Sequence, residues 1–202
     1  MLIDDLKQQF QNSTIVKIND DSNTIRVIFC NSQNTEKYCD LMILNSLTLE
    51  ELSKNDKILV VVGANPALCD ELLIDRTNSN LISILKSKSN KCKTYKAYCL
   101  INLYNEIAGS FCDFYNANPH QSNSNETTIV NFLKDFTNSE LLIMWGSTFK
   151  KSYKPKSSGQ LYAWVNSNAK NVFVSANAKN DFCHGSVASQ IINYSSNIKN
   201  IW

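Results

Sequence analysis

Apolar residues gather in four short runs in the second part of the chain, and each run is followed by a polar turn. The runs are Ile58–Gly63, Ala97–Leu103, Leu141–Gly146 and Asn171–Ala176. Hydrophobicity that is continuous rather than alternating is typical of parallel strands, which are covered on both faces. Helical periodicity between and after the runs predicts helices over Asn78–Ser87, Glu126–Thr137, Gln160–Ser167 and Ser186–Tyr194. This alternation predicts an α/β fold: a three-layer α/β/α sandwich around a central four-stranded, mainly parallel sheet.

The first part of the chain has a different pattern. Two short runs rich in β-branched residues, Ser13–Lys17 and Thr24–Cys30, flank a turn-rich cluster at residues 19–23, which predicts a β-hairpin. A third apolar run, Asp40–Leu44, precedes a short predicted helix that starts at Ser46 or Thr48 and ends near Lys54. We therefore expect residues 1–56 to form an N-terminal β-hairpin and helix appendage, and residues 57–202 to form the α/β domain.

Composition narrows the class of protein without identifying it. The 202 residues are 43% hydrophobic and 19% charged, as in a globular domain. No run approaches eighteen apolar residues and the N-terminus lacks the features of a secretory signal, so we expect a cytoplasmic protein with no membrane contact. The seven cysteines include no C-x-x-C pair, so they predict buried, reduced thiols and imply neither a metal site nor a cofactor.

The net charge does not by itself indicate a nucleic-acid-binding protein, because its formal value is only +2. Any electrostatic attraction to phosphate must come from local patches, and two lysine clusters are candidates. They lie at residues 86–96 and 150–156. Solvated faces are the more common use of such clusters. The sequence does not predict an oligomeric state.

Ligands of open α/β sheets bind beyond the carboxyl ends of the strands, so the residues after each run are candidate site residues. Gly63-Ala64-Asn65-Pro66 closes the first run, and Asn102 closes the second. The third ends in Trp145-Gly146-Ser147, and His184 follows the fourth after a short interval. A long polar loop at residues 109–124 adds aromatic side chains.

In this order and approximate spacing, the strand ends resemble the uracil-DNA glycosylase superfamily, and more closely a bacterial and phage branch classed as a domain of unknown function. The resemblance covers residues 57 to 190. Gly63-Ala64-Asn65-Pro66 matches the Gly-x-Asn-Pro turn of the mismatch and thymine glycosylase branch. His184-Gly185-Ser186-Val187-Ala188-Ser189 keeps the His and both Ser of the last signature, His-Pro-Ser-Pro-Leu-Ser. The branch match also uses Asp75-Arg76-Thr77, Asn102-Leu103 and Trp145-Gly146.

The resemblance implies a DNA glycosylase-like protein that binds a flipped nucleobase and hydrolyses the N-glycosidic bond of a damaged or modified base in DNA. The catalytic candidates are Asn65 and His184, with Asp70 or Asp75 as a proton acceptor. The candidates for base binding are Asn102, Tyr104, Phe111 and Phe114. The candidates for contacts to the DNA backbone are Gly63, Ser147, Lys150, Lys151, Ser186 and Ser189. The implied partner is DNA or a nucleotide.

Departures from the signatures leave a second hypothesis open. Both prolines of the last signature are absent, Ala188 replaces the intercalating Leu, and Asn65 replaces the activating Asp of the uracil-specific branch. These losses favour a nucleic-acid or nucleotide-binding module that has no catalytic activity. Phage defence or counter-defence is one setting in which such a module would act. A third hypothesis is a protein-interaction domain whose N-terminal hairpin extends the sheet of a partner.

Each candidate residue also has a purely structural interpretation. Asn65-Pro66 is a common turn sequence that ends a strand. Asn102 is one of twenty-seven asparagines, so it can be a strand-end residue without a functional role. His184 is one of two histidines, and its imidazole can make a hydrogen bond that serves only the structure. Asp75 can pair with Arg76 or cap the helix that follows. Trp145 and the aromatic residues of the long loop can simply fill a core.

Overall fold

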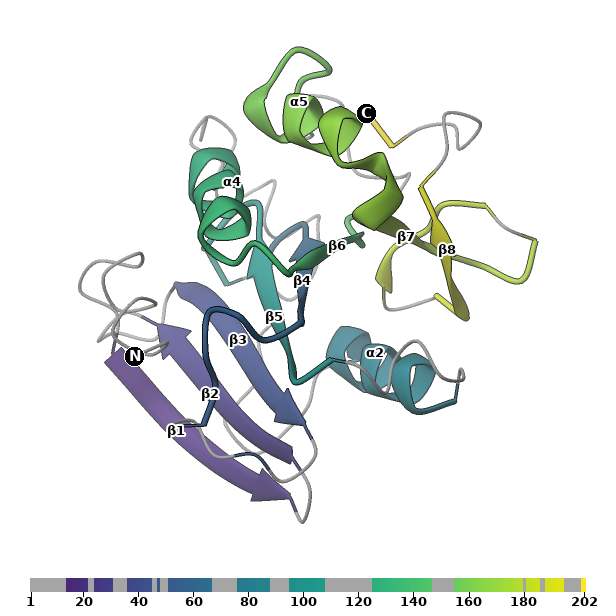
Figure 1. Ribbon diagram of the computed structural model, residues 1–202. Coiled ribbons are helices and arrows are strands. Elements are labelled where there is room, and N and C mark those ends of the chain that lie inside the picture. The colour runs from purple at the N-terminus through teal and green to yellow at the C-terminus, as the bar shows by residue number, and fades with distance from the viewer. Residues whose placement is uncertain are drawn as a thin grey trace.

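The computed structural model describes residues 14–21, 24–30, 36–44, 47, 51–66, 76–87, 95–107, 125–146, 155–179, 181–185, 188–194 and 201–202. These residues form one eight-stranded mixed sheet with the strand order β1-β2-β3-β5-β4-β6-β7-β8 (Figure 1). The strands are β1 Thr14–Asp21, β2 Thr24–Cys30, β3 Lys37–Leu44, β4 Ile58–Gly63, β5 Ala97–Asn102, β6 Glu140–Ile143, β7 Val172–Ala176 and β8 Gln190–Asn193. The described helices are α2 Arg76–Ser87, α4 Glu126–Asp135, α5 Gln160–Ser167 and the short 3₁₀ helix η2 Ala169–Asn171.

The four apolar runs form the strands β4, β5, β6 and β7, which pair in parallel in the order β5-β4-β6-β7. Every residue of β4 and β5 is buried, because both faces of these strands are covered. On one face, Val60 and Val62 pack in the large core cluster with residues of α4 and α5. On the other face, Leu59 and Val61 pack in a smaller cluster with Leu81 of α2. Helices therefore cover both sides of the sheet.

The prediction of a four-stranded sheet with a hairpin appendage is wrong, although the α/β class stands. β3 pairs antiparallel with β5, opposing Asp40 to Leu100, while β2 pairs with β3 and β1 with β2. The first three strands thus extend the central sheet instead of standing apart from it. The physical reason is burial: without β3, the strand β5 would be an open edge, and Val27 and Phe29 of β2 would lose their place in the core.

A second correction concerns the end of the chain. We predicted a helix over Ser186–Tyr194, but Gln190–Asn193 is the edge strand β8, which pairs antiparallel with β7. Ile191 and Ile192 are only partly buried, so their spacing could not distinguish the two structures. The predicted helix from Ser46 or Thr48 to near Lys54 is wrong where the structure describes it, because residues 51–54 form turns and irregular backbone, while residues 46 and 48–50 lie outside the described residues. The predicted domain boundary between residues 56 and 57 stays a prediction.

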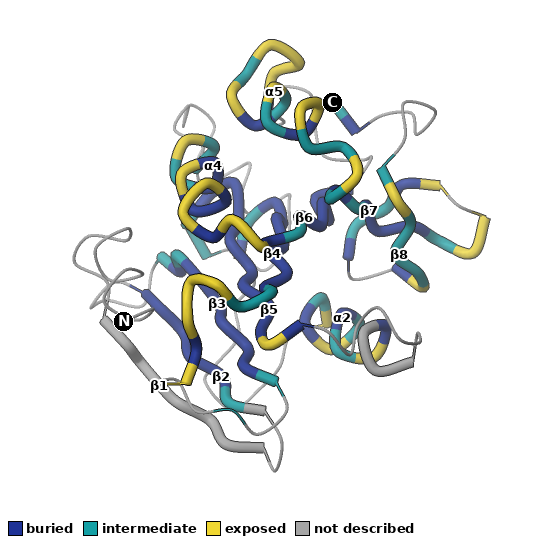
Figure 2. Tube along the Cα trace, in the orientation of Figure 1, coloured by how far each residue is buried: buried dark blue, intermediate teal, exposed yellow. Residues whose placement is uncertain are grey.

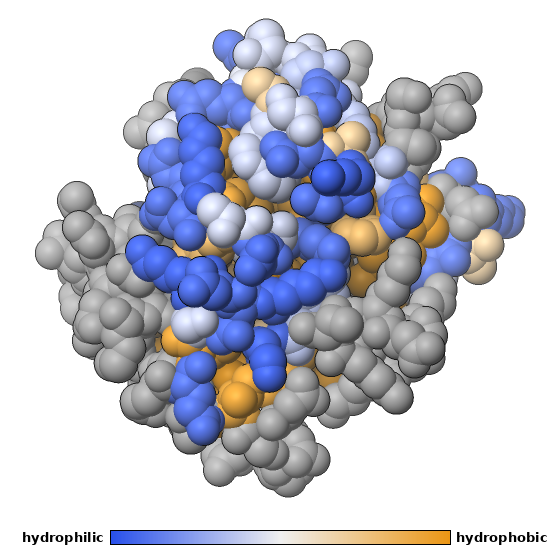
Figure 3. Space-filling model, viewed as in Figure 1, coloured by the Kyte–Doolittle hydropathy of each residue, from blue (hydrophilic) through white to orange (hydrophobic). Residues whose placement is uncertain are grey.

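Polar residues on the outer faces of the helices separate the core from solvent. α4 buries Ile129, Val130, Phe132 and Leu133 and turns its other residues outward. Figure 2 shows the buried residues concentrated in the central strands and on the inner sides of the helices. From the same side, the described surface is mainly hydrophilic, with smaller apolar patches between (Figure 3).

Four cysteines lie in the described residues, all as free thiols. Cys30, Cys39 and Cys99 are buried and Cys183 is partly buried. The Sγ atoms of Cys39 and Cys99 lie 2.8 Å apart across β3 and β5. Burial raises the pKa of the Cys39 thiol well above its ordinary value of 9.0, and the Cys99 thiol raises it further. Cys30, Cys39 and Cys99 therefore act as small buried hydrophobes.

Candidate functional site at the carboxyl edge of the sheet

Asn102 and Gly63 lie opposite each other at the carboxyl ends of β5 and β4. Asn102 is only 4% exposed, and a Cβ atom on Gly63 would overlap its Oδ1 atom. The same added atom would lie 3.5 Å from Leu100 Cδ1, which belongs to the cluster that α2 covers. The Asn102 side chain therefore lies on the α2 side of the sheet. It packs against the backbone of Gly63, where a side chain on residue 63 would overlap it.

The Asn102 amide is the most informative polar group at this edge. The backbone carbonyl of Asn102 accepts a hydrogen bond from Asn125 Nδ2 at 3.0 Å, which ties the end of β5 to the start of α4. The side-chain amide of Asn102 lies against Gly63, and the residue is only 4% exposed. An amide carries both a donor and an acceptor, so this group is suited to a ligand with matching donors and acceptors.

Asn65 follows β4 by two residues and lies at the same edge. The backbones of the two strands stay paired beyond their ends, since Leu103 N donates to Gly63 O at 3.0 Å and Tyr104 N to Ala64 O at 3.1 Å. Asn65 is partly buried, and its Nδ2 donates to Pro66 O at 3.2 Å. This local bond agrees with the turn interpretation and leaves the amide oxygen of Asn65 outside that bond. Its catalytic role stays a prediction.

His184 reaches the same edge from the far end of the chain. It forms an isolated bridge with Trp145, and Gly185 N donates to Met144 O at 3.1 Å. Met144 N in turn donates to Val62 O of β4 at 2.8 Å. His184 therefore lies beside the residue that follows β6, and β6 is the neighbour of β4 in the sheet. The residue is partly buried.

A close approach of two backbones fixes His184. Gly146 has φ +85°, and a Cβ atom there would lie 2.8 Å from His184 N and 2.9 Å from its Cβ. The left-handed conformation and the lack of space both require glycine at this position. The segment after β6 and the segment before β8 are thus pressed together at His184.

The first turn of α2 packs against the residue after His184. Asn80 Nδ2 donates to Gly185 O at 3.1 Å. A Cβ atom on Gly185 would lie 2.8 Å from Thr77 Cγ2 and would overlap Met144 Cε. Helix α2 therefore lies over the carboxyl edge, on the same side of the sheet as Asn102. The sequence analysis did not single out Thr77 or Asn80 as contacts of the site, because only the packing of the helix brings them to Gly185.

Glu106 provides a carboxyl group near this edge that the sequence analysis missed. It follows β5 by four residues and forms an isolated bridge with Glu36. Burial raises the pKa of Glu106 from its ordinary value of 4.5, and the charge of Glu36 raises it further, while backbone N–H groups of Glu106 and Asn105 lower it. Its position just after a candidate strand end was the available signal.

The structure separates Tyr104 from Asn102. Tyr104 is 4% exposed and packs in the cluster covered by α4 and α5, whereas Asn102 lies on the α2 side. Trp145 is also a core residue, and its Nε1 donates to Ile201 O at 3.0 Å. The structural interpretation of Trp145 is therefore correct. Gly63 is buried beneath Asn102, so its role here is to make room for the amide.

Of the other residues predicted to contact the base or the DNA backbone, few lie within the described residues. Ser189 is exposed, and its backbone N–H donates to Ala176 O at 3.0 Å. Lys96 and Lys156, one from each lysine cluster, are exposed. The other predicted site residues lie outside the described residues: Asp70, Asp75, Phe111, Phe114, Ser147, Lys150, Lys151 and Ser186.

No group of three or more His, Cys, Asp or Glu side chains in the described residues is arranged to hold a metal ion. Among the helices in the described part of the chain, none has the length and apolar character needed to cross a membrane.

Comparison with known families gives one match. The model of a family described as "Protein of unknown function (DUF1643)" matches residues 47–185, a segment that includes β4 to β7 and the carboxyl edge with Asn65, Asn102 and His184. No curated protein and no solved structure matches the chain.

Proposed function

We propose that this chain, which belongs to the DUF1643 family, binds a nucleobase of DNA at the carboxyl edge of its sheet and hydrolyses the N-glycosidic bond of a damaged or modified base. The observation that carries the proposal is the Asn102 amide, which is largely buried at the carboxyl edge of the sheet against the glycine that ends β4. Its paired donor and acceptor match the Watson–Crick edge of a flipped base. The ordered resemblance of the strand ends to uracil-DNA glycosylases supports the same chemistry.

The proposed reaction needs four tasks, three of which fall to Asn102, Asn65 and His184. Asn102 holds the edge of the base. Asn65 positions a water molecule whose oxygen bonds to C1′ of the sugar as the bond from C1′ to the base nitrogen breaks. A nearby carboxylate takes the proton of that water, and His184 donates a hydrogen bond to the carbonyl oxygen of the departing base, where negative charge develops. The electron pair of the broken bond leaves with the base.

The geometry at the edge is compatible with this division of tasks. Asn65 follows β4, and His184 bridges Trp145 just after β6, the strand that neighbours β4. Side chains that extend from these two segments can reach one planar ring between them. Asn102 occupies the next strand beyond β4, which allows a third contact to the same ring.

A second candidate function is a nucleotide-binding module without catalysis. Ala188 favours it, because this residue is only 7% exposed and has no side chain that could enter a base stack. Asn65 favours it too, since an amide cannot take a proton from water as a carboxylate can. In this alternative, Asn102 still binds the base, and His184 contributes only to affinity.

One experiment separates the two functions. The purified protein is incubated with oligonucleotides that carry uracil and a panel of modified bases, and the strands are then cleaved at abasic sites with alkali. We expect cleavage of at least one substrate, which is lost in His184→Ala, while binding to the uncleaved oligonucleotide is retained in part. Binding without cleavage across the panel supports the second candidate, and neither binding nor cleavage contradicts both.

A further inference from the structure

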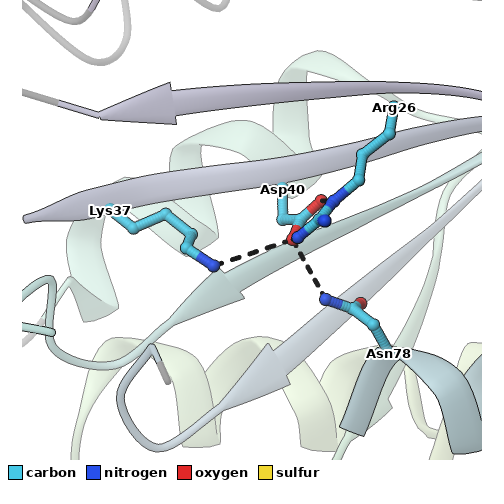
Figure 4. Close-up of polar contacts among 4 residues, drawn as sticks. All are labelled: Arg26, Lys37, Asp40 and Asn78. Carbon is cyan, nitrogen blue, oxygen red and sulfur yellow. Dashed lines mark hydrogen bonds and ion pairs between the residues drawn. The ribbon is translucent and has the colours of Figure 1, made fainter. Parts of the chain in front are cut away.

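A charged cluster is buried beneath the first turn of α2, next to the proposed site. Its centre is Asp40 of β3, which is 0% exposed. Arg26 of β2 holds both carboxylate oxygens, with Nε at 2.9 Å from Oδ1 and Nη2 at 2.6 Å from Oδ2. Lys37 Nζ lies 3.8 Å from Oδ2 on another side of the carboxylate (Figure 4).

A buried carboxylate is stable only when its charge is compensated. The two-pronged bond to Arg26 provides this compensation in a favourable geometry. Replacing such a pair by apolar residues is often neutral for stability, whereas removing one partner typically costs 3–5 kcal/mol. A cluster of this kind is therefore weak evidence for a role in stability, and its specific contacts must explain its position.

The specific contact is to helix α2. Asn78 Nδ2 donates to Asp40 Oδ2 at 3.0 Å, and Asn78 is 0% exposed. Asn78 lies between Thr77 and Asn80, the two residues of α2 that pack on Gly185. A single helical turn is thus attached to β3 on one side and to the His184 segment on the other. In Figure 4, Asn78 extends from its helix toward Asp40.

The tight packing at Gly185 makes the position of this turn important. Gly185 fits between Thr77 and Met144 with no space for a methyl group. A shift of α2 therefore moves Gly185 or opens a gap beside it, and His184 is its direct neighbour in the chain. Protein interiors respond to such changes because they are close-packed.

We propose that Asp40 is a positioning residue of the candidate site: through Asn78 it fixes the first turn of α2, and this turn fixes Gly185 and the adjacent His184. The role of His184 rests on the proposed function, whereas the positioning is a property of the fold. Arg26, Lys37 and Asp40 precede residue 47, where the match to the family begins, so strands outside the matched segment help to order a site inside it.

The test uses His184 itself as the reporter, in the whole protein and without a ligand. The chain has only two histidines, so the imidazole signals in a proton–carbon NMR spectrum can be assigned from the His184→Ala variant. Asn78→Ala removes the bond to Asp40 and leaves the Arg26 pair intact. We expect the His184 signals to shift in this variant.

Tyr95→Phe is the matched control. It also removes one hydrogen bond to a carboxylate, because Tyr95 OH donates to Glu140 Oε2. Glu140 starts β6, so this bond lies at the opposite end of the parallel strands. We expect the His184 signals of Tyr95→Phe to match those of the original protein, although both variants lose stability.

A second variant keeps the test decisive if Asn78→Ala does not fold. Asn80→Ala removes the bond to Gly185 O, on the other side of the same turn, and is expected to shift the His184 signals as well. Unchanged His184 signals in the folded variants overturn the proposal, and so does an equal shift in Tyr95→Phe.

Binding measurements distinguish this proposal from the proposed function. With an oligonucleotide that the protein binds, we expect Asn78→Ala to bind about tenfold more weakly than Tyr95→Phe. Shifted His184 signals in a protein that binds no base on the panel contradict the proposed function and support the positioning. Unshifted signals in a protein that binds a base contradict the positioning alone.

Discussion

Gly63 and Asn102 face each other across β4 and β5, and the amide oxygen of Asn102 fills the space that a side chain on Gly63 would need. The position of the amide therefore depends on the absence of a methyl group on the neighbouring strand. The role of Asn102 can therefore be tested by a substitution at Gly63 that leaves Asn102 itself unchanged.

Gly63→Ala is expected to displace the Asn102 amide and abolish base binding while the chain still folds. The added methyl group overpacks a buried site, which typically costs about 1–3 kcal/mol of unfolding free energy. Denaturant unfolding measures this cost, and an oligonucleotide binding assay measures the loss of function. Gly159→Ala is the control, because Gly159 precedes α5 and its methyl group would overlap Glu126 Oε1 of α4. Equal binding by both variants contradicts the role of Asn102.

Gly146→Ala is expected to destabilise the protein and disturb His184. The left-handed conformation at φ +85° costs a residue with a side chain about 1–2 kcal/mol, and the added Cβ atom would also press on the His184 backbone. Each kcal/mol corresponds to about 2–4 °C in Tm for a chain of this size. Thermal unfolding checks the prediction.

A Gly146→Asn variant separates the cost of the left-handed conformation from the cost of the added Cβ atom. Asparagine tolerates the left-handed conformation better than alanine but carries the same Cβ atom. Gly146→Asn is therefore expected to be more stable than Gly146→Ala and less stable than the original protein. A Gly146→Ala variant with an unchanged Tm would show that the two segments can move apart at no cost.

The carboxyl group of Glu106 is expected to oppose folding at neutral pH. Because burial raises its pKa above the ordinary value of 4.5, the folded protein binds more protons than the unfolded chain between pH 4.5 and the folded-state pKa. Stability from this group therefore falls as the pH rises through that interval. The Tm of Glu106→Gln relative to the original protein should be higher at pH 7 than at pH 4.

Thermal unfolding of both proteins at the two pH values provides the measurement. Any effect of the amide that does not depend on pH cancels in the comparison. Glu36→Gln is a useful companion, because removing the neighbouring charge should reduce the pH dependence that Glu106 causes. A relative Tm that is the same at both pH values contradicts the raised pKa.

A chain that starts at residue 57 is expected not to fold into a stable monomer. Such a chain lacks β1, β2 and β3, which exposes the edge of β5 and removes Val27 and Phe29 from the core. It also leaves Asn78 without the Asp40 carboxylate. Far-ultraviolet circular dichroism and size-exclusion chromatography of residues 57–202 are the measurements. A folded monomer would support the predicted boundary between residues 56 and 57.

The local pattern of the sequence predicted the central elements well. β4 coincides with the run Ile58–Gly63, and α5 coincides with the predicted helix Gln160–Ser167. Both depend on neighbouring residues: a buried strand needs a continuous apolar run, and an amphipathic helix needs a regular apolar spacing. The edge strand β8 escaped prediction because Gln190–Asn193 is short and only partly buried, so its conformation follows from pairing with β7.

The positions of three candidate residues at this edge could be predicted for the same reason. Asn65, Asn102 and His184 each follow an apolar run or a recognisable signature, and the structure places all three at the carboxyl edge. Asp40 and Asn78 gave no comparable signal. The sequence alone does not show which Asp or Asn is buried. Asn78, which donates to Asp40, is one of twenty-seven asparagines.

By itself, the sequence determined the α/β class, the four parallel strands and the residues that end them, because these depend on patterns within a few turns or one strand length. Only the tertiary structure decided that β1, β2 and β3 extend the sheet, and that Asp40 reaches Asn78. Strand pairing and the burial of charge join residues that are far apart in the chain, and their free energy exists only once the chain has brought them together.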